Sequence, residues 1–319
     1  MQLLPEVNRH MNEIQQKNSI MERPAVVWLC AMLCCALWGS AFPSVKMVYR
    51  LFSIGAEDTA SLILIAGCRF SLAGLIVIAV ISIQAGKLVL PVKGDGKYIL
   101  TLSLFQTIGQ YAFYFIGLAH MAGVKASIMD GMNTFFSILI AVYLFHQEKM
   151  TGRKILGCLI GFAGLVLVSM DGSSISWDFH ILGEGFMILS ALSASFSTCL
   201  IRMFTQQRSP AMLSGYQFLL GGLMMIAAGL AAGGHLTMTS FFTIPLLLYC
   251  ALISSVAYTL WSVLLKHNPV SRIAVFGFMT QVFGVAISAV VLSESSLLTW
   301  TLLLSLILVC TGIYIVNRE

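Results

Sequence analysis

The sequence predicts an all-α integral membrane protein whose ten transmembrane helices form two inverted five-helix repeats. Three observations lead to this fold class: charge is scarce, the apolar runs are long, and the second half of the chain repeats the first. Of the 319 residues, 58% are hydrophobic and 10% are charged, whereas about 25% are charged in ordinary soluble domains. So few charges would not cover the surface of a soluble fold of this length, and we expect most of the surface to contact lipid.

The apolar runs fill nearly the whole chain after residue 23. A helix needs about 20 apolar residues to cross the hydrocarbon core of a bilayer. By this criterion the first five spans are residues 25–46, 59–83, 98–120, 124–145 and 154–170, and the second five are 181–204, 212–233, 244–266, 271–291 and 297–316. The longest segment outside the membrane is then the polar tail of residues 1–23, which lacks the cleavage site of a signal peptide.

The two halves align with each other at an offset of 146 to 148 residues. In this alignment Arg69 corresponds to Gln217 and Tyr111 to Tyr258. We therefore divide the chain into a cytoplasmic N-terminal tail (1–23), a first repeat (24–171) and a second repeat (172–319). Because each repeat holds an odd number of spans, the second is inverted in the membrane. Inverted repeats recur in secondary transporters, where the substrate site lies between the repeats.

The basic residues predict the orientation of the chain. Cytoplasmic loops of membrane proteins carry an excess of lysine and arginine. With both termini in the cytoplasm of a multi-pass cell-membrane protein, the inner segments hold most of the 18 basic residues: Arg9, Lys17, Arg23, Lys87, Lys93, Lys97, Lys149, Arg153, Lys154, Arg202, Arg208, Lys266, Arg272 and Arg318. The net charge of +5 thus reflects topology, and we expect no nucleic-acid partner.

A family resemblance rests on motifs in several spans. They are Ala36-Leu37-Trp38-Gly39-Ser40-Ala41-Phe42 in the first span, Arg69-Phe70 with Ala73-Gly74 in the second, Glu148 after the fourth, and Gly157-Cys158-Leu159-Ile160-Gly161-Phe162-Ala163-Gly164 in the fifth. With these motifs the chain resembles an EamA-type member of the drug/metabolite transporter superfamily. The resemblance implies a five-plus-five inverted repeat with a central cavity, and export or exchange of small metabolites. Members often carry a proline in the middle of the fourth span, where this chain has Asn133-Thr134-Phe135.

Asp130 is the leading candidate for a transport residue. It lies about two turns into the fourth span, where a charged side chain costs on the order of 3 kcal/mol. It must therefore face an aqueous cavity, pair with a cation or bind a proton. We favour a cavity role, with proton coupling as a hypothesis. The alternative is a structural ion pair with Arg69 or Lys125. Asn133 shares the helix face of Asp130 and is expected to line the same cavity.

Arg69, near the middle of the second span, has two interpretations of equal weight. It is a fixed positive charge for an anionic or carboxylate substrate, or it forms a structural ion pair that orients spans within the first repeat. Direct pairing with Asp130 is a further alternative, and opening of that pair would then be part of the transport cycle. The neutral Gln217 at the equivalent position shows that the fold does not require the charge twice.

Aromatic residues away from the interfacial belts form a third group. Such rings offer stacking area together with one polar group each, which suits amphipathic metabolites or amino acids. Helix packing is the alternative for each residue singly. As a set we expect them to line the cavity, together with Gln110: Trp38, Tyr111, Tyr114, Tyr258 and Trp261.

Two further features concern the helices themselves. Pro43 cannot donate a hydrogen bond to Gly39, so the first span is expected to kink there, either as a hinge for gating or as a static bend. Glu148 and its equivalent Glu294 each precede the next helix, where a carboxylate meets the positive end of the helix dipole. We interpret both carboxylates as structural.

The sequence thus predicts a secondary transporter that exports or exchanges small polar or amphipathic metabolites, amino-acid-like or drug-like, by alternating access. No hydrolase, metalloprotease or phosphate-loop motif is present, so we expect no enzyme, no cofactor and no metal site. The expected partners are a small-molecule substrate, the lipid bilayer and protons, with the protein a monomer or a homodimer. The alternatives are an uptake permease or a membrane-embedded protein without transport activity, such as a sensor or subunit.

Overall fold

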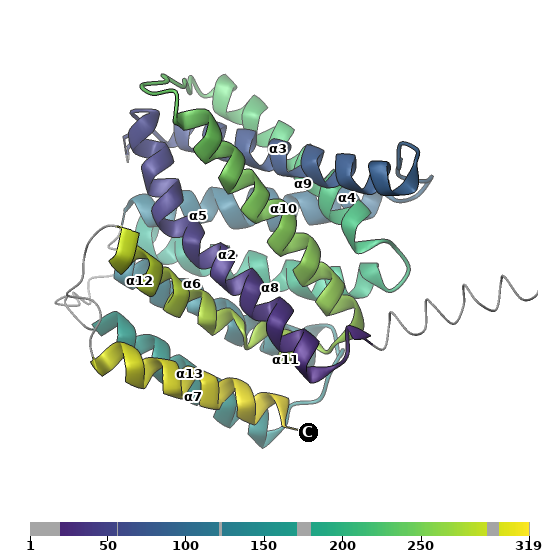
Figure 1. Ribbon diagram of the computed structural model, residues 1–319, viewed down its shortest axis with the longest axis vertical. Helices are drawn as coiled ribbons and strands as arrows, with labels where there is room; N and C mark the ends of the chain where they lie inside the picture. The colour runs from purple at the N-terminus through teal and green to yellow at the C-terminus, as the bar shows by residue number, and fades with distance from the viewer. Residues whose placement is uncertain (1–19, 56, 121–122, 171–179, 292–299, 319) are drawn as a thin grey trace, which may run out of the picture.

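The computed structural model describes residues 20–55, 57–120, 123–170, 180–291 and 300–318, and its regular elements are helical over these ranges. In the first repeat they are α2 (Pro24–Leu51), α3 (Thr59–Ala85), α4 (Gly96–Leu102), the π-helical η1 (Ser103–Gly109), α5 (Gln110–Ala119), α6 (Gly123–Leu139), η2 (Ile140–Leu144) and α7 (Gly152–Met170). The second repeat holds η3 (Ile181–Gly185), α8 (Phe186–Thr205), α9 (Pro210–Ala231), α10 (Thr243–His267), α11 (Val270–Ala274), α12 (Gly277–Val291) and α13 (Trp300–Asn317). Figure 1 shows their arrangement.

The observed helices confirm the predicted fold class, because each predicted span coincides with one helix or with consecutive helical segments. The third span consists of α4, η1 and α5, and the ninth of α11 and α12. Within the described ranges, six helical stretches are long and apolar enough to cross a membrane, judged by length and composition. Residues 297–299 of the predicted tenth span lie outside the described ranges.

Local sequence signals account for several helix starts. Asp58 accepts a hydrogen bond from the Ser61 amide at 3.0 Å and caps α3. Hydrogen bonding from the Ser61 side chain and amide lowers the pKa of the Asp58 carboxyl below its ordinary value. Ser209 caps α9 in the same way, and Pro210 occupies its first turn. Both arrangements satisfy amide groups that a helix start leaves unpaired.

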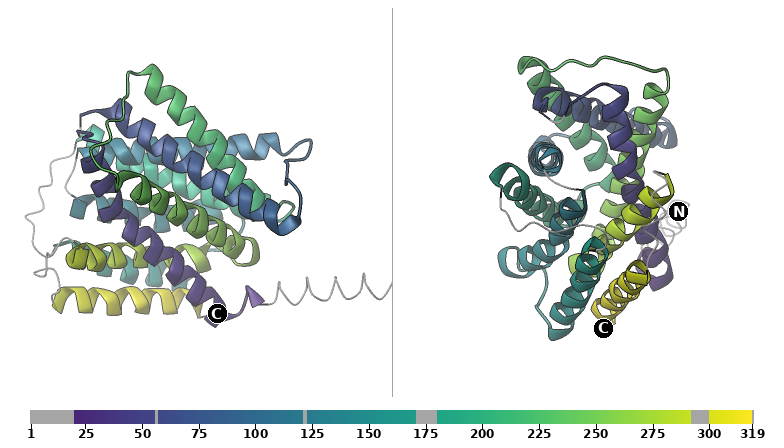
Figure 2. Two further views of the ribbon diagram at one scale, coloured as in Figure 1. Left: turned by 45° about the horizontal axis from the view of Figure 1, so that its top comes forward. Right: turned by 90° about the vertical axis from the view of Figure 1, so that its left-hand side faces the viewer.

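The two repeats pack through equivalent helices. The most extensive contacts join α3 with its counterpart α9, and α7 with its counterpart α13. In Figure 1 the first pair lies along the top of the bundle and the second along the bottom, and Figure 2 shows the same separation from two other sides. The packing of α2 on α12 is matched by the packing of α8 on α6. In the repeat alignment α8 is the counterpart of α2, and α6 is the counterpart of α12. The bundle therefore has an approximate two-fold axis.

Glycines bring α3 and α9 into close contact. A Cβ atom on Gly67 would lie 2.8 Å from the Gly222 carbonyl, and one on Gly74 would lie 2.6 Å from the Gly215 carbonyl. At an offset of 148 residues, Gly67 is equivalent to Gly215 and Gly74 to Gly222. The contact is thus reciprocal, as two-fold symmetry requires, and helix backbones approach this closely only where side chains are small.

Candidate substrate-binding cavity

A central cavity of about 140 Å³ lies between the two repeats. Its wall is formed by side chains from α2, α3, η1, α5, α6, α8, α10 and α12, and many of them are polar or aromatic. The structure places all nine cavity residues expected from the sequence on this wall: Trp38, Arg69, Gln110, Tyr111, Tyr114, Asp130, Asn133, Tyr258 and Trp261. That these residues bind a substrate remains a prediction.

Two tyrosines meet at the centre of the cavity wall. The hydroxyl groups of Tyr111 and Tyr258 form a hydrogen bond with each other, and the two residues are equivalent in the repeats. Their rings pack against the equivalent residues Phe70 and Phe218, with centroids 4.3 Å and 5.1 Å away, and these two phenylalanine rings stack at 5.4 Å. The four rings therefore surround the two-fold axis, and each repeat contributes half of the cluster.

Arg69 reaches from α3 into α10 of the second repeat. Its Nε donates to the Cys250 carbonyl and to the Ser254 hydroxyl, both at 3.2 Å, and its guanidinium carbon lies 5.2 Å from the centre of the Phe70 ring. Among the described residues no carboxylate lies within ion-pair distance of this side chain. The charge is therefore held by neutral groups.

The neutral counterpart Gln217 contacts the equivalent residues, but it accepts hydrogen bonds where Arg69 donates them. It accepts a hydrogen bond from Thr107 at 2.6 Å, and Ser103 donates to its carbonyl at 2.9 Å. At an offset of 147 residues, Thr107 and Ser103 correspond to Ser254 and Cys250. Gln217 thus joins α9 to η1, which are the counterparts of the helices α3 and α10 that Arg69 joins. The positive charge is an addition to this shared arrangement.

Asp130 is bound to Gln281 of α12. The Gln281 amide donates to Asp130 Oδ2 at 2.6 Å, while the Gln281 amide oxygen is buried without a hydrogen-bond partner among the described residues. Asp130 and Arg69 do not form an ion pair with each other, although both line the cavity. The alternative of a direct Arg69–Asp130 ion pair is therefore not observed. Arg69 instead bonds neutral groups of α10, and Asp130 bonds the neutral Gln281 of α12.

The two tryptophans form an apolar part of the wall. Trp38 of α2 packs edge-on against Tyr258 and against Trp261, each with ring centroids 5.0 Å apart. The indole nitrogen of Trp38 is buried and has no hydrogen-bond partner among the described residues. This corner of the cavity offers stacking area beside the charged groups.

Small polar side chains line the part of the cavity farther along α6. Ser195 of α8 donates to the Asn133 side-chain oxygen at 2.6 Å and also to its carbonyl at 2.9 Å. Thr134 donates to the Ala274 carbonyl of α11 at 3.2 Å. These bonds join α6 to α8 and α11 of the second repeat.

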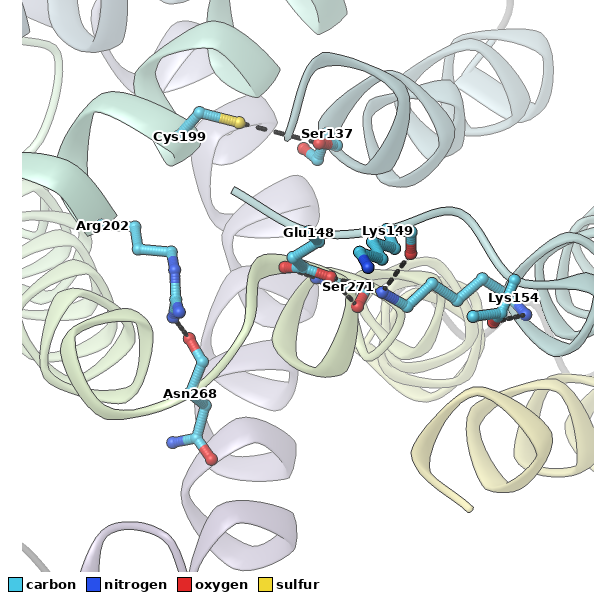
Figure 3. Close-up of polar contacts among 9 residues, drawn as sticks. Ser137, Glu148, Lys149, Lys154, Cys199, Arg202, Asn268 and Ser271 are labelled. Carbon is cyan, nitrogen blue, oxygen red and sulfur yellow. Dashed lines mark hydrogen bonds and ion pairs between the residues drawn. The ribbon is translucent and has the colours of Figure 1, made fainter. Parts of the chain in front are cut away.

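Polar contacts close the bundle beyond the cavity at the end where α2 begins and α13 ends, which we call the terminal face. Glu148 Oε1 accepts the Ser271 amide at 3.1 Å, and its Oε2 accepts the Ser271 hydroxyl and the Lys154 ammonium, the latter at 2.7 Å. Figure 3 shows this carboxylate between the start of α11 and Lys154 of α7. Nearby, Gln147 donates to the Cys199 carbonyl at 3.0 Å and Arg202 donates to the Asn268 carbonyl.

Burial by itself would raise the pKa of Glu148, but the hydrogen bonds from Lys154 and Ser271 outweigh it, so the pKa of this carboxyl lies below its ordinary value of 4.5. Glu148 does meet a helix start, as the sequence indicated. That helix is α11 of the other repeat, whereas α7, which follows Glu148 in the chain, contributes the ammonium of Lys154. The equivalent Glu294 lies outside the described residues.

The family model for the EamA-like transporter family matches the chain twice, over residues 26–170 and 181–318. The chain belongs to the EamA-like transporter family. The two matches correspond to the two halves that pack around the cavity.

Relatives of this EamA-like transporter include a Salmonella typhimurium protein named "Probable amino-acid metabolite efflux pump", 28% identical over 304 residues that cover 89% of this chain and 92% of the relative. An Archaeoglobus fulgidus protein named as an uncharacterized transporter is 25% identical and covers 92% of this chain and 99% of its own. A solved crystal structure superposes with a TM-score of 0.74 at 15% identity, covering 92% of this chain and 96% of the other. The last similarity supports the fold.

Several cavity residues of this transporter were not among those predicted. Gln281 and Thr280 of α12 and Ser197 and Thr198 of α8 line the wall. Periodicity did not single out these polar residues in otherwise apolar spans. The repeat alignment could have identified two of them. Thr280 and Gln281 align near Thr134, which lies on the face of the fourth span that bears Asp130.

The proposed hinge lies within an unbroken helix. Pro43 is an internal residue of α2, and Ser44 donates to the Ser40 carbonyl at 2.8 Å while Ser40 donates to that of Leu37 at 2.7 Å. Gly39 has a packing role, since a Cβ atom there would lie 2.7 Å from Phe283 and 2.8 Å from the Gly284 amide of α12. Whether Pro43 and Gly39 act as a hinge stays a prediction.

Two GxxxG motifs, Gly157 with Gly161 and Gly229 with Gly233, contain glycines that pack against other helices of this chain. Gly157 of α7 lies against Gly312 of α13, where an added Cβ would come within 2.7 Å of the Gly312 carbonyl. Gly229 of α9 lies against Leu64 of α3. Intramolecular contacts thus account for these motifs, and the oligomeric state stays a prediction.

Proposed function

We propose that this protein is a secondary transporter that exports a small polar or amphipathic metabolite by alternating access at the central cavity. The observation that carries the proposal is a cavity between inverted repeats whose described wall includes the acidic Asp130 and the basic Arg69, which are not paired with each other. Substrate sites of inverted-repeat transporters lie at this place, near the bilayer midplane, and ionisable groups at such depth mark substrate or ion pathways.

The size of the cavity favours a small substrate. Its volume is about 140 Å³, whereas sites for drug-sized ligands span roughly 300–1,000 Å³. Between the two substrate classes expected from the sequence, amino-acid-like metabolites therefore fit better than drug-like ones. The name of the Salmonella typhimurium relative indicates the same class of substrate and efflux.

The driving force is proposed to be a proton gradient, with Asp130 as the coupling residue. Its carboxylate binds either a proton or a cationic group of the substrate, so that binding of one releases the other. Export of the substrate would then be exchanged for inward proton movement. This idea rests on the place of Asp130 in the cavity and on its single neutral partner Gln281 among the described residues.

We further propose that both termini face the cytoplasm and that the protein resides in the cell membrane. The basic residues of the inner loops support this orientation. In this orientation the terminal face is cytoplasmic, and the contacts around Glu148 close the cavity toward the cytoplasm. Labelling of single cysteines introduced at Lys149 and Glu57 with an impermeant maleimide tests it, because only position 57 should react from outside intact cells.

The test of the function compares metabolites that accumulate in the medium of cells carrying an empty vector, the wild-type protein or Asp130→Asn. All proteins are first shown to be in the membrane. A metabolite enriched only by the wild-type protein supports export and a role of Asp130 in the cycle. Enrichment by both proteins, with the same pH dependence, keeps export and removes Asp130 from the coupling step. Depletion of a metabolite from the medium indicates uptake instead.

A further inference from the structure

We propose that Arg69 and Asp130 form the two ends of a zwitterion site, in which Arg69 binds the carboxylate of an α-amino acid and Asp130 binds its ammonium group. The proposal rests on the transport function proposed above and names the substrate class and the two residues that select it. A side chain of apolar character would then lie against Trp38 and Trp261.

The basic end of the site is a guanidinium group whose terminal nitrogens are available to donate hydrogen bonds to a ligand. Arg69 is 6% exposed, and its hydrogen bonds to the described residues engage only Nε. The two terminal nitrogens donate to no described residue, although they belong to a side chain that lines the cavity. Because these nitrogens form a planar fork, they match the two oxygens of a carboxylate.

At the acidic end of the site, one carboxylate oxygen of Asp130 is available to accept a hydrogen bond from a ligand. Gln281 occupies Oδ2 of Asp130, and Oδ1 receives no hydrogen bond from a described residue. The buried Gln281 oxygen beside it also lacks a partner among the described residues. Gln281 is 2% exposed. An ammonium group carries three donors and no acceptor, so it can satisfy both oxygens at once, which a carboxylate or a neutral apolar group cannot do.

The two charges together select the ligand. A charge held among neutral groups within a membrane is costly, and the described residues of the cavity wall include one of each sign, Arg69 and Asp130. An anion would compensate Arg69 and leave Asp130 uncompensated, and a cation would do the reverse. A zwitterion compensates both charges and keeps the net charge of the occupied cavity unchanged.

The comparison between the repeats indicates that the charge of Arg69 serves a ligand. Gln217 joins the equivalent helices through the equivalent residues without any charge. A guanidinium is therefore not needed to hold α3 against α10. The same comparison makes Arg69→Gln a substitution that this framework accommodates.

The apolar part of the ligand has a defined place. Trp38 packs edge-on against both Tyr258 and Trp261, and all three residues line the cavity wall. An aliphatic or aromatic side chain gains stacking area there, and the volume of about 140 Å³ limits its size.

The test uses purified full-length protein in detergent and three probes that share an isobutyl side chain and differ in the charged groups they carry. L-leucine carries both groups, 4-methylpentanoate lacks the ammonium group, and 3-methylbutylamine lacks the carboxylate. Dissociation constants are measured by titration calorimetry or by quenching of tryptophan fluorescence. We expect the wild-type protein to bind leucine about tenfold or more tightly than either analogue, which corresponds to about 1.4 kcal/mol per lost interaction.

Two variants assign the ends. Arg69→Gln should abolish the preference for leucine over 3-methylbutylamine and retain the preference over 4-methylpentanoate. Asp130→Asn should show the opposite pattern. Arg69→Lys keeps the positive charge and should retain the preference for a carboxylate, so it serves if Arg69→Gln does not fold. Gel filtration and thermal unfolding establish that each variant is folded.

The outcomes separate this inference from the proposed function. If either analogue binds as tightly as leucine, or if the two variants change the same preference, the zwitterion site is wrong. It is equally wrong if leucine, serine and phenylalanine all fail to bind while the protein still enriches another metabolite in the medium. If the protein neither binds these probes nor changes any metabolite in the medium, the transport function itself fails.

Discussion

Tyr111 and Tyr258 occupy the same position in the two repeats, and their hydroxyl groups bond to each other on the approximate two-fold axis. Alternating access in an inverted repeat exchanges the conformations of the two halves. A contact between two equivalent residues is the same contact after the exchange. A contact between non-equivalent residues, such as Glu148 with Ser271, is replaced by the contact between the corresponding residues of the other repeats. We therefore expect the tyrosine pair to persist in both access states.

The tyrosine pair predicts a strongly coupled double-mutant cycle. Tyr111→Phe or Tyr258→Phe leaves one buried hydroxyl without this partner, at a cost of about 1–2 kcal/mol of unfolding free energy. The double variant removes both hydroxyls and should cost less than the sum of the two single changes. Guanidinium unfolding in mild detergent measures the cycle.

A matched control for that cycle is Tyr143→Phe, since Tyr143 is 65% exposed on the outer surface and its change should have no measurable effect. Additive effects of Tyr111→Phe and Tyr258→Phe would show that the two hydroxyls do not stabilise each other.

The close approach of α3 and α9 predicts that Gly222 tolerates no side chain. In Gly222→Ala the new Cβ would lie 2.5 Å from the Ser71 amide and 2.8 Å from the Gly67 carbonyl. Because these are backbone atoms on the partner helix, the two helices must separate, and we expect a loss of about 2 kcal/mol. Thermal unfolding followed by tryptophan fluorescence measures the loss.

Gly152→Ala provides the comparison, because an added Cβ there has nothing within 4 Å. This change should leave the unfolding temperature unaltered or raise it slightly. Equal destabilisation by the two substitutions would contradict the close contact between the repeats.

The carboxylate at the terminal face predicts a large effect of Glu148→Gln. The side chains of Glu148 and Lys154 are 6% and 9% exposed, so removing the negative charge leaves a buried ammonium without its ion-pair partner. Breaking a buried pair in this way costs about 3 kcal/mol. Chemical unfolding should show this loss, while Glu57→Gln, an exposed carboxylate, should leave stability unchanged.

The same carboxylate predicts a pH dependence of stability. The pKa of Glu148 is below its ordinary value of 4.5 in the folded protein, so the folded state binds this proton less readily than the unfolded chain does. Its contribution to stability is complete above about pH 4.5 and is lost as the pH falls through the lower folded value. The stability difference between the wild-type protein and Glu148→Gln should therefore shrink in acid. A difference that stays constant from about pH 6 to pH 3 would show that the carboxylate is not stabilised by its partners.

The repeat in the sequence predicted a large part of the cavity wall. Aligning Tyr111 with Tyr258 and Arg69 with Gln217 placed equivalent residues near one axis, and the structure brings the predicted residues to one wall. Gln281 was missed because a lone glutamine in an apolar span has no periodic signal. The helix start that Glu148 contacts is that of α11 and not that of α7, the next helix in the chain, which contributes Lys154 instead.

By itself the sequence determined the all-helical membrane fold and its division into two inverted halves, because both follow from runs of apolar residues and from a duplication, which are properties read along the chain. Only the tertiary structure decided that Asp130 bonds Gln281, that Arg69 bonds Cys250 and Ser254, and that these two charges share a cavity without pairing. Such contacts depend on which faces of helices more than a hundred residues apart meet. Hydrophobic burial hardly distinguishes between helix faces in lipid, so close packing and hydrogen bonds make that choice.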